Sequence, residues 1–272
     1  MTVCRHFLST ESGKPASAHT FHKPPHLMID FQFDSSTVSP SKKRAMRLLR
    51  QELEKSAIHA RVVPYILIVG LTFIQDSQAG PARYWLYFIK MVVGLWCVWE
   101  MRSLVPEMRW AFSWEAVMVG VLVWAIWVFL NPYYPKFEFL FSAGDPWNPF
   151  KQFGNNSAMG WFFVAVRTFG SALIVPPIEE ACYRSFLYRY FVKIDFTKMP
   201  FNRLHWLSLV VTSLLFGLVH YQWLAGFFCG LLFQGLVIRK NRLGDAMTAH
   251  AITNFLLGVW IVWKGGDAWH FW

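Results

Sequence analysis

The stretch Ile178-Glu179-Glu180-Ala181-Cys182-Tyr183-Arg184 places two adjacent acids and an arginine directly after a long apolar run. The chain around it has 272 residues, of which 55% are hydrophobic and 15% are charged, whereas a soluble domain carries about 25% charged residues. Fifteen Trp and 26 Phe are typical of lipid contact and of aromatic belts at a membrane interface. Ionisable groups inside a membrane are costly, so these acids mark a functional site by default.

Seven apolar segments recur along the chain after a polar beginning. Each is expected to form a helix, because an open sheet would leave backbone groups unsatisfied in lipid. Flanking aromatic residues extend most of them toward the ~20 residues that cross a bilayer. The segments are Val62–Ile74, Tyr84–Val98, Trp114–Leu130, Trp161–Val175, Trp206–Val219, Leu224–Ile238 and Ala246–Trp263. The sequence therefore predicts an all-α fold, a polytopic transmembrane helical bundle with about seven helices.

The pair Pro176-Pro177 leaves the number of crossings open at seven or eight. Proline breaks or kinks a helix but is tolerated in a first turn, so we expect a new helix over Ile178–Lys193. That helix would be either an eighth span or an in-plane segment. The basic residues before residue 61, in Arg184–Arg203 and in Arg239–Arg242 favour seven crossings, with a cytoplasmic N-terminus and the C-terminus outside.

The two acids are expected to have different roles. Glu180 and Arg184 are four residues apart, the spacing at which a carboxylate and a guanidinium meet on one helix face. Glu179 lies about 100° away from Glu180 around the helix, so it is free to face a cavity. A desolvated carboxylate there would act as a general base on water near neutral pH. The alternative is a helix start enriched in acids, with a routine ion pair.

Two further polar pairs lie in later apolar segments, Phe216 with His220 and His250 with Asn254. His250 and Asn254 share one helix face, and a buried Asn needs partners for its donor and its acceptor. One interpretation is a hydrogen bond that only fastens helices together. The other is that His220, His250 and Asn254 line one cavity with Glu179 and supply a proton relay and an oxyanion donor.

The three motifs Glu-Glu-x-x-x-Arg, Phe-x-x-x-His and His-x-x-x-Asn occur in this order. This pattern resembles the CAAX-protease and bacteriocin-processing (Abi, CPBP) family of intramembrane glutamate endopeptidases. The resemblance covers roughly Trp161 to Trp263. It implies that Glu179 activates water with the help of His220, that His250 and Asn254 help to stabilise the oxyanion, and that no cofactor or metal is used. Glu180 and Arg184 would then be supporting residues.

One departure from the family pattern is Ser185, where many relatives have glycine; we expect it to affect helix packing. A second difficulty is depth. In a seven-span arrangement His220 falls near the outer end of its helix, whereas Glu179 falls near the inner end of its own. A tilted, kinked or re-entrant segment Ile178–Lys193 would be needed to bring the two side chains together.

Three other interpretations stay open. Glu179, His220 and His250 could form a catalytic zinc site with one open position, although no compact His-x-x-x-His motif is present. The polar residues could instead be interhelical fasteners of a non-catalytic membrane scaffold. A proton-coupled transporter with a relay from Glu179 to His220 is the fourth interpretation, but the sequence shows no inverted repeat, which many transporters have.

Three more charged residues lie in or near the apolar segments. Lys90 and Glu115 are near the ends of segments, where long side chains reach water, so we expect structural roles. Arg167 lies in the middle of Trp161–Val175 and needs a partner. We expect it to pair with Glu179 or Glu180; the alternative is that it faces the cavity and meets a substrate carboxylate.

Three parts are expected along the chain: a basic cytoplasmic tail over 1–60, transmembrane helices and a long loop over 61–156, and a catalytic transmembrane core over 157–272. The net charge of +10 comes from the tail and the loops, as in membrane proteins, so no nucleic-acid partner is expected. The expected partners are the lipid bilayer and a membrane-bound peptide or protein substrate. The absence of an apolar signal core at the start fits a bacterial inner membrane.

Overall fold

A computed structural model describes residues 40–136 and 146–272. The chain divides into the units Met1–Pro40 and Ser41–Trp272, and the second unit contains nearly all of these residues. Most of the predicted basic tail and the middle of the long loop therefore lie outside the described residues.

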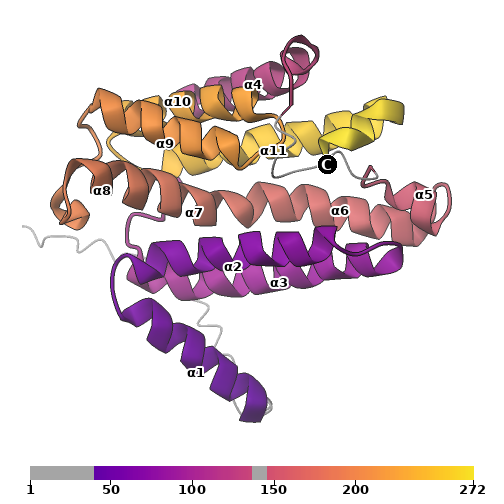
Figure 1. Cartoon of the computed structure of the whole chain (residues 1–272), viewed down its shortest axis with the longest axis horizontal. Coiled ribbons are helices and arrows are strands. Elements are labelled where there is room, and N and C mark those ends of the chain that lie inside the picture. The colour runs from indigo at the N-terminus through magenta and orange to yellow at the C-terminus, as the bar shows by residue number, and fades with distance from the viewer. Residues whose placement is uncertain (1–39, 137–145) are drawn as a thin grey trace, which may run out of the picture. The chain divides into compact units, whose positions relative to one another are not determined.

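The prediction of an all-α membrane bundle is confirmed: every ordered element in the described ranges is helical (Figure 1). Each of the seven predicted segments lies within a helix or extends past its end by one or two residues. The helices are α2 (His59–Asp76), α3 (Pro81–Leu104), α4 (Trp114–Phe129), α6 (Ala158–Leu173), α9 (Trp206–Leu218), α10 (Trp223–Lys240) and α11 (Gly244–Lys264). The shorter helices α1 (Pro40–Glu54) and α5 (Pro149–Phe153) precede α2 and α6.

The region around the proline pair differs from the expectation. The helix α7 (Val175–Glu180) continues α6, followed by the π-helix η3 (Ala181–Leu187) and by α8 (Tyr188–Val192). Together they form one helical segment of 35 residues, Ala158–Val192. Both prolines occupy the first turn of α7, where a missing N–H costs little, so they mark a joint in a continuing helix.

The length of this segment removes the difficulty over the depth of Glu179. At 1.5 Å per residue, 35 residues span about 52 Å, whereas the apolar core of a bilayer is about 30 Å thick. Thirteen residues separate Glu179 from Val192, which corresponds to about 20 Å. Glu179 therefore lies well inside the segment and not at its end.

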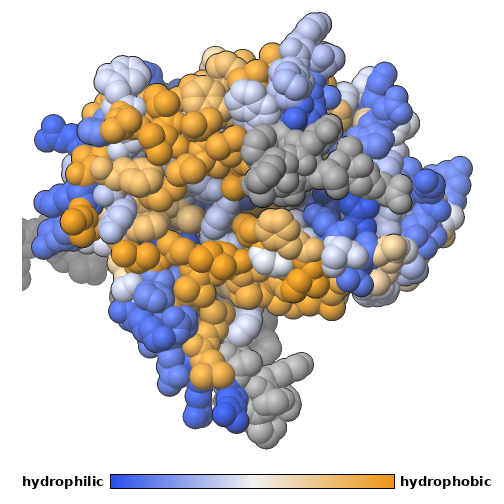
Figure 2. Space-filling view, viewed as in Figure 1, coloured by the Kyte–Doolittle hydropathy of each residue, from blue (hydrophilic) through white to orange (hydrophobic). Residues whose placement is uncertain are grey.

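Three helices are long and apolar enough to cross a membrane, Ala158–Val192, Trp223–Lys240 and Gly244–Lys264, and α4 and α9 are shorter apolar helices. The surface in Figure 2 is hydrophobic over the middle of the helices and hydrophilic toward both sides of the view. Large apolar side chains such as Trp206, Leu207 and Trp263 are 70%, 69% and 79% exposed, which fits contact with lipid. The number of crossings stays a prediction.

Close helix contacts at small residues position the site. A side chain at Gly120 of α4 would place its Cβ 2.7 Å from the backbone oxygen of Ala249 on α11. At Gly230 of α10 a Cβ would lie 2.7 Å from the Cα of Ser213 on α9. Glycine therefore lets these backbones approach, as is usual between membrane helices, and the first contact lies next to His250.

Candidate active site

Glu180 is a buried carboxylate that forms an ion pair with Arg184 at the site. Its side chain is 0% exposed, and Arg184 Nε lies 3.2 Å from its Oε2 atom, which is the contact predicted from the four-residue spacing. The Arg184 guanidinium also lies over the ring of Phe216 at 4.2 Å from the ring centre. Helix α7 and η3 present the acid and the arginine to the bundle interior, where each charge has its counter-charge.

His250 on α11 connects the two acids, a contact that the sequence analysis did not foresee. Its Nδ1 atom lies 2.9 Å from Glu180 Oε1, and its Nε2 atom lies 3.9 Å from Glu179 Oε2. A carboxylate only accepts hydrogen bonds, so Nδ1–H donates to Glu180. This bond fixes the ring, and it leaves Nε2 facing Glu179. Glu180 thus orients the ring of His250 as well as pairing with Arg184.

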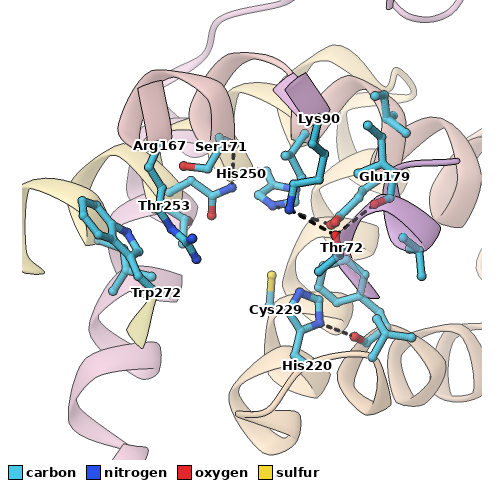
Figure 3. Close-up of a pocket in the computed structure, with 18 of the residues that line it drawn as sticks. Thr72, Lys90, Arg167, Ser171, Glu179, His220, Cys229, His250, Thr253 and Trp272 are labelled. Carbon is cyan, nitrogen blue, oxygen red and sulfur yellow. Dashed lines mark hydrogen bonds and ion pairs between the residues drawn. The ribbon is translucent and has the colours of Figure 1, made fainter. Parts of the chain in front are cut away.

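Glu179 faces a cavity of about 380 Å³ that also has His220, His250 and Asn254 in its wall. The Glu179 side chain is 18% exposed. Its Oε2 atom is buried and has no hydrogen-bond partner among the described residues. A buried carboxylate oxygen needs such a partner, and a water molecule in the cavity would supply it. Figure 3 shows Glu179 and His250 at the cavity.

His220 follows the C-terminal end of α9 and is held by its own chain. Its Nδ1 atom lies 2.7 Å from the backbone oxygen of Phe216, and a carbonyl only accepts, so Nδ1 carries the proton. The ring packs against Trp127, with 5.4 Å between the ring centres. The four-residue spacing of Phe216 and His220 therefore has a local reason: the first residue orients the second, whose ring lines the cavity.

Asn254 lies one turn after His250 on α11. Its Nδ2 atom donates to the backbone oxygen of Ser171 on α6 at 2.8 Å. This interhelical bond is the fastener that one interpretation foresaw. Nδ2 carries a second N–H, and Asn254 also lines the cavity, so the residue fastens α6 to α11 and retains donor capacity toward the cavity.

The prediction that Arg167 pairs with Glu179 or Glu180 is wrong. Arg167 lines the cavity, and its guanidinium lies 4.8 Å from the ring centre of Tyr87 and 4.6 Å from that of Trp147. Twelve residues of helix separate it from Glu179, about 18 Å, which is too far for an ion pair.

The expectation that Lys90 reaches water from a segment end is also wrong. Lys90 is 6% exposed and lines the cavity. Its Nζ atom donates to Gln75 Oε1 at 2.7 Å and to Thr72 Oγ1 at 3.1 Å. The signal was present in the sequence, because an intramembrane lysine is a functional candidate by default.

The structural role expected for Glu115 agrees with its position, since Glu115 lies outside the cavity wall. Lys240 Nζ donates to Glu115 Oε1 at 3.2 Å.

Ser185 belongs to a second buried polar cluster, composed of Arg61, Glu107, Ser185 and Arg189. The Ser185 hydroxyl donates to Glu107 and accepts from Arg61 Nε at 2.9 Å and from Arg189 Nη2 at 2.8 Å. Arg61 Nη2 lies 2.6 Å from Glu107 Oε1. The hydroxyl thus ties η3 to α2 and to the α3–α4 loop, which is a polar form of the packing role that we expected.

The proposed zinc site finds no support in the arrangement of side chains. In the two described ranges, no group of three or more His, Cys, Asp or Glu side chains is placed as metal ligands. Glu179, His220 and His250 line one cavity but are not gathered as a ligand set.

The fold and the site define a helical membrane protein with a polar centre inside the bundle. Residues 161–256 match the family model described as "Type II CAAX prenyl endopeptidase Rce1-like". This region contains all six predicted site residues and is similar to the Rce1-like CAAX proteases. The resemblance drawn from the three motifs is thereby confirmed over this part of the chain. No curated protein and no solved structure matches the chain.

Proposed function

We propose that the protein is an intramembrane endopeptidase that hydrolyses a peptide bond of a membrane-associated polypeptide without a metal. The observation that carries this proposal is the unpartnered Oε2 atom of Glu179 in the cavity, 3.9 Å from His250 Nε2. The family is one of CAAX-type proteases, which agrees with hydrolysis.

Glu179 rather than Glu180 is the base. Glu180 is 0% exposed, is held by both Arg184 and His250, and does not line the cavity. Glu179 lines the cavity, and its Oε2 atom has no hydrogen-bond partner among the described residues. A positioned carboxylate of this kind contributes about 10²–10⁴-fold to a rate as a general base.

The reaction balances without a further reactant. Glu179 takes a proton from water, and the water oxygen adds to the carbonyl carbon of the scissile bond. The negative charge that develops on the carbonyl oxygen is stabilised by Asn254 as a preorganised donor and by His250 in its protonated form, in which Nε2 also carries a proton. His220 orients the water. The C–N bond then breaks, and the proton passes from Glu179 to the leaving amine.

The substrate and the membrane are parts of the same proposal. The family description contains the words "CAAX prenyl endopeptidase", so a polypeptide with a lipid-modified cysteine near its end is the first candidate. An apolar cavity wall inside the bundle fits a lipid-linked chain. The basic loop residues are consistent with a bacterial inner membrane.

The test is a cleavage assay on the detergent-solubilised protein, with a peptide that carries a farnesylated cysteine followed by three residues. The wild-type protein should release the terminal residues, and Glu179→Gln, which is nearly isosteric, should not. Glu115→Gln is the matched control, because this acid lies outside the cavity and bonds to Lys240. Cleavage by Glu179→Gln at the wild-type rate would exclude Glu179 as the base.

A further inference from the structure

The cavity has a second end that the proposed hydrolysis does not use. Figure 3 shows Glu179 on one side of the view and Arg167 with Trp272 on the other, with His250 between them. Lys90 also lies in the wall. A wider hollow of about 770 Å³ adjoins this end and shares Lys90, Arg167 and Trp272 with the cavity.

Neither basic group at this end has a carboxylate side chain as a partner among the described residues. Lys90 Nζ bonds only to the neutral groups of Gln75 and Thr72 and lies 4.6 Å from the ring centre of Tyr87. Arg167 forms no hydrogen bond or ion pair to any residue of the described ranges, and its guanidinium rests on aromatic rings. Asp76, in the wall of the wider hollow, is 48% exposed and lies 4.0 Å from Arg83.

Basic and acidic side chains are unequal in number in the cavity wall. The wall contains the two basic side chains of Lys90 and Arg167, and Glu179 has the one carboxylate side chain among the described lining residues. Charges within a membrane bundle pair with one another or belong to a substrate pathway. Rings hold a cation by about 0.5–2 kcal/mol and cannot accept the charge-assisted hydrogen bonds that a carboxylate accepts. A bound anion would supply such a partner.

Arg167 and Glu179, at the two ends of the cavity, lie on one helical segment, which sets the distance between them. Arg167 and Glu179 are twelve residues apart on the segment Ala158–Val192, about 18 Å along the axis. An extended peptide covers this length in about five residues, at roughly 3.3 Å each. An anion held by Arg167 would thus lie about five residues from the bond that Glu179 attacks.

We infer that Lys90 and Arg167 form a carboxylate-binding subsite that selects substrates with an anionic group about five residues from the scissile bond. The carboxylate is either the free terminus of the substrate or an acidic side chain. This inference rests on the proposed function and assigns specificity to two residues outside the three motifs. Arg167 presents a planar, fork-shaped guanidinium suited to a carboxylate, and Lys90 adds a second charge.

The first experiment compares substrates on the wild-type protein and needs no variant. Three farnesylated peptides share one sequence with about five residues after the farnesylated cysteine. The first ends in a free carboxylate, the second in an amide, and the third in an amide with Asp in the last position. The free acid should have a KM at least about tenfold below that of the plain amide. Restoration of the low KM by the Asp peptide identifies a side-chain carboxylate as sufficient; no restoration identifies the terminus. Equal KM values for all three peptides overturn the inference and leave the proteolysis intact.

The second experiment removes the subsite. Arg167→Gln and Lys90→Gln should each raise the KM of the free acid toward that of the amide, with the KM of the amide unchanged. Arg167→Lys should keep part of the preference, which a merely structural role of Arg167 would not predict. Arg102→Gln is the matched control, because Arg102 is an exposed arginine of α3 that lies over Trp99, outside the cavity. An undiminished preference in the double variant Lys90→Gln, Arg167→Gln overturns the inference.

Binding to Glu179→Gln protein separates this inference from the proposed proteolysis. The free-acid peptide should raise the melting temperature of that protein more than the amide does. Such a preference without cleavage by wild type would mean that the site exists and the proposed hydrolysis is wrong. Equal shifts would mean that the carboxylate subsite is wrong.

Discussion

Two buried ionic clusters include residues of the long helical segment Ala158–Val192, and their carboxylates differ in how many partners they have. In the cluster of Arg61, Glu107, Ser185 and Arg189, one carboxylate receives two guanidinium groups and a hydroxyl. In the cavity, Glu179 has an oxygen with no partner in the described residues. Glu107 and Glu179 are both largely buried, and both are near basic groups. They differ in the number of partners that bond to their oxygens, and this difference separates a structural acid from a candidate base.

The largest expected effect distinguishes the two clusters by activity. Glu179→Gln should reduce cleavage by about 10²–10⁴-fold, the usual contribution of a general base, with little change in melting temperature because its Oε2 atom has no partner to lose. Initial rates and thermal unfolding of the same preparation check this. A large loss of stability in Glu179→Gln would mean that Glu179 is a structural acid like Glu107.

The converse substitution should affect stability rather than turnover. Glu107→Gln leaves two buried guanidinium groups with no counter-charge, which costs about 3–5 kcal/mol for a fully buried pair and less here, because the Glu107 side chain is 13% exposed. We expect a loss of about 2–3 kcal/mol and an unchanged kcat per folded molecule. Denaturant unfolding in detergent measures the first and active-site-normalised kinetics the second; a normal stability would contradict the network.

The same cluster predicts a dependence of stability on pH. Burial raises the pKa of Glu107, but Arg61 and Ser185 more than offset this, so the pKa lies below its ordinary value of 4.5. A lowered pKa in the folded state contributes stability above the ordinary pKa, and this is lost as the pH falls through the folded value. The melting temperature should therefore fall below about pH 4.5 more steeply in wild type than in Glu107→Gln, where this titration is absent. Parallel pH profiles of the two proteins would show that Glu107 is not ionised in the cluster.

A smaller effect should come from the hydroxyl that stands where many relatives have glycine. Ser185→Gly removes the contacts that Ser185 makes with Glu107, Arg61 and Arg189, and a buried hydrogen bond contributes about 0.5–1.5 kcal/mol net. We expect a loss of about 1–2 kcal/mol with unaltered KM. Thermal unfolding measures it, and Ser208→Gly on α9 provides a comparison at a buried serine outside the cluster. A stabilised Ser185→Gly protein would be the contrary result.

Removal of metal ions is expected to have no effect on the cleavage rate. Exhaustive treatment with a metal chelator should leave the cleavage rate unchanged, because the described residues offer no metal-ligand cluster and Glu179 activates water directly in the proposal. A rate that falls with chelator and returns with zinc would favour the metal-assisted alternative.

The sequence was sufficient for the helices and for the contact between Glu180 and Arg184, because helical spacing and apolar periodicity are local properties. It was insufficient where partners come from other helices. The bond from His250 to Glu180 spans seventy residues, and the fate of Arg167 depends on Tyr87 and Trp147. We expected Lys90 to reach water because it lies near the end of an apolar run. The packing of α3 against α2 buries it instead.

The π-helix Ala181–Leu187 constrains how this protein can change. A π-turn corresponds to one additional residue within an α-helix, and each residue turns the helix by about 100°. Deleting one residue from this stretch would restore regular winding and swing Arg189 away from Glu107 while Glu180 stayed in place. Insertions and deletions between the proline pair and α8 should therefore disrupt the contact of Arg189 with Glu107. Substitutions of side chains there leave the winding of the helix unchanged.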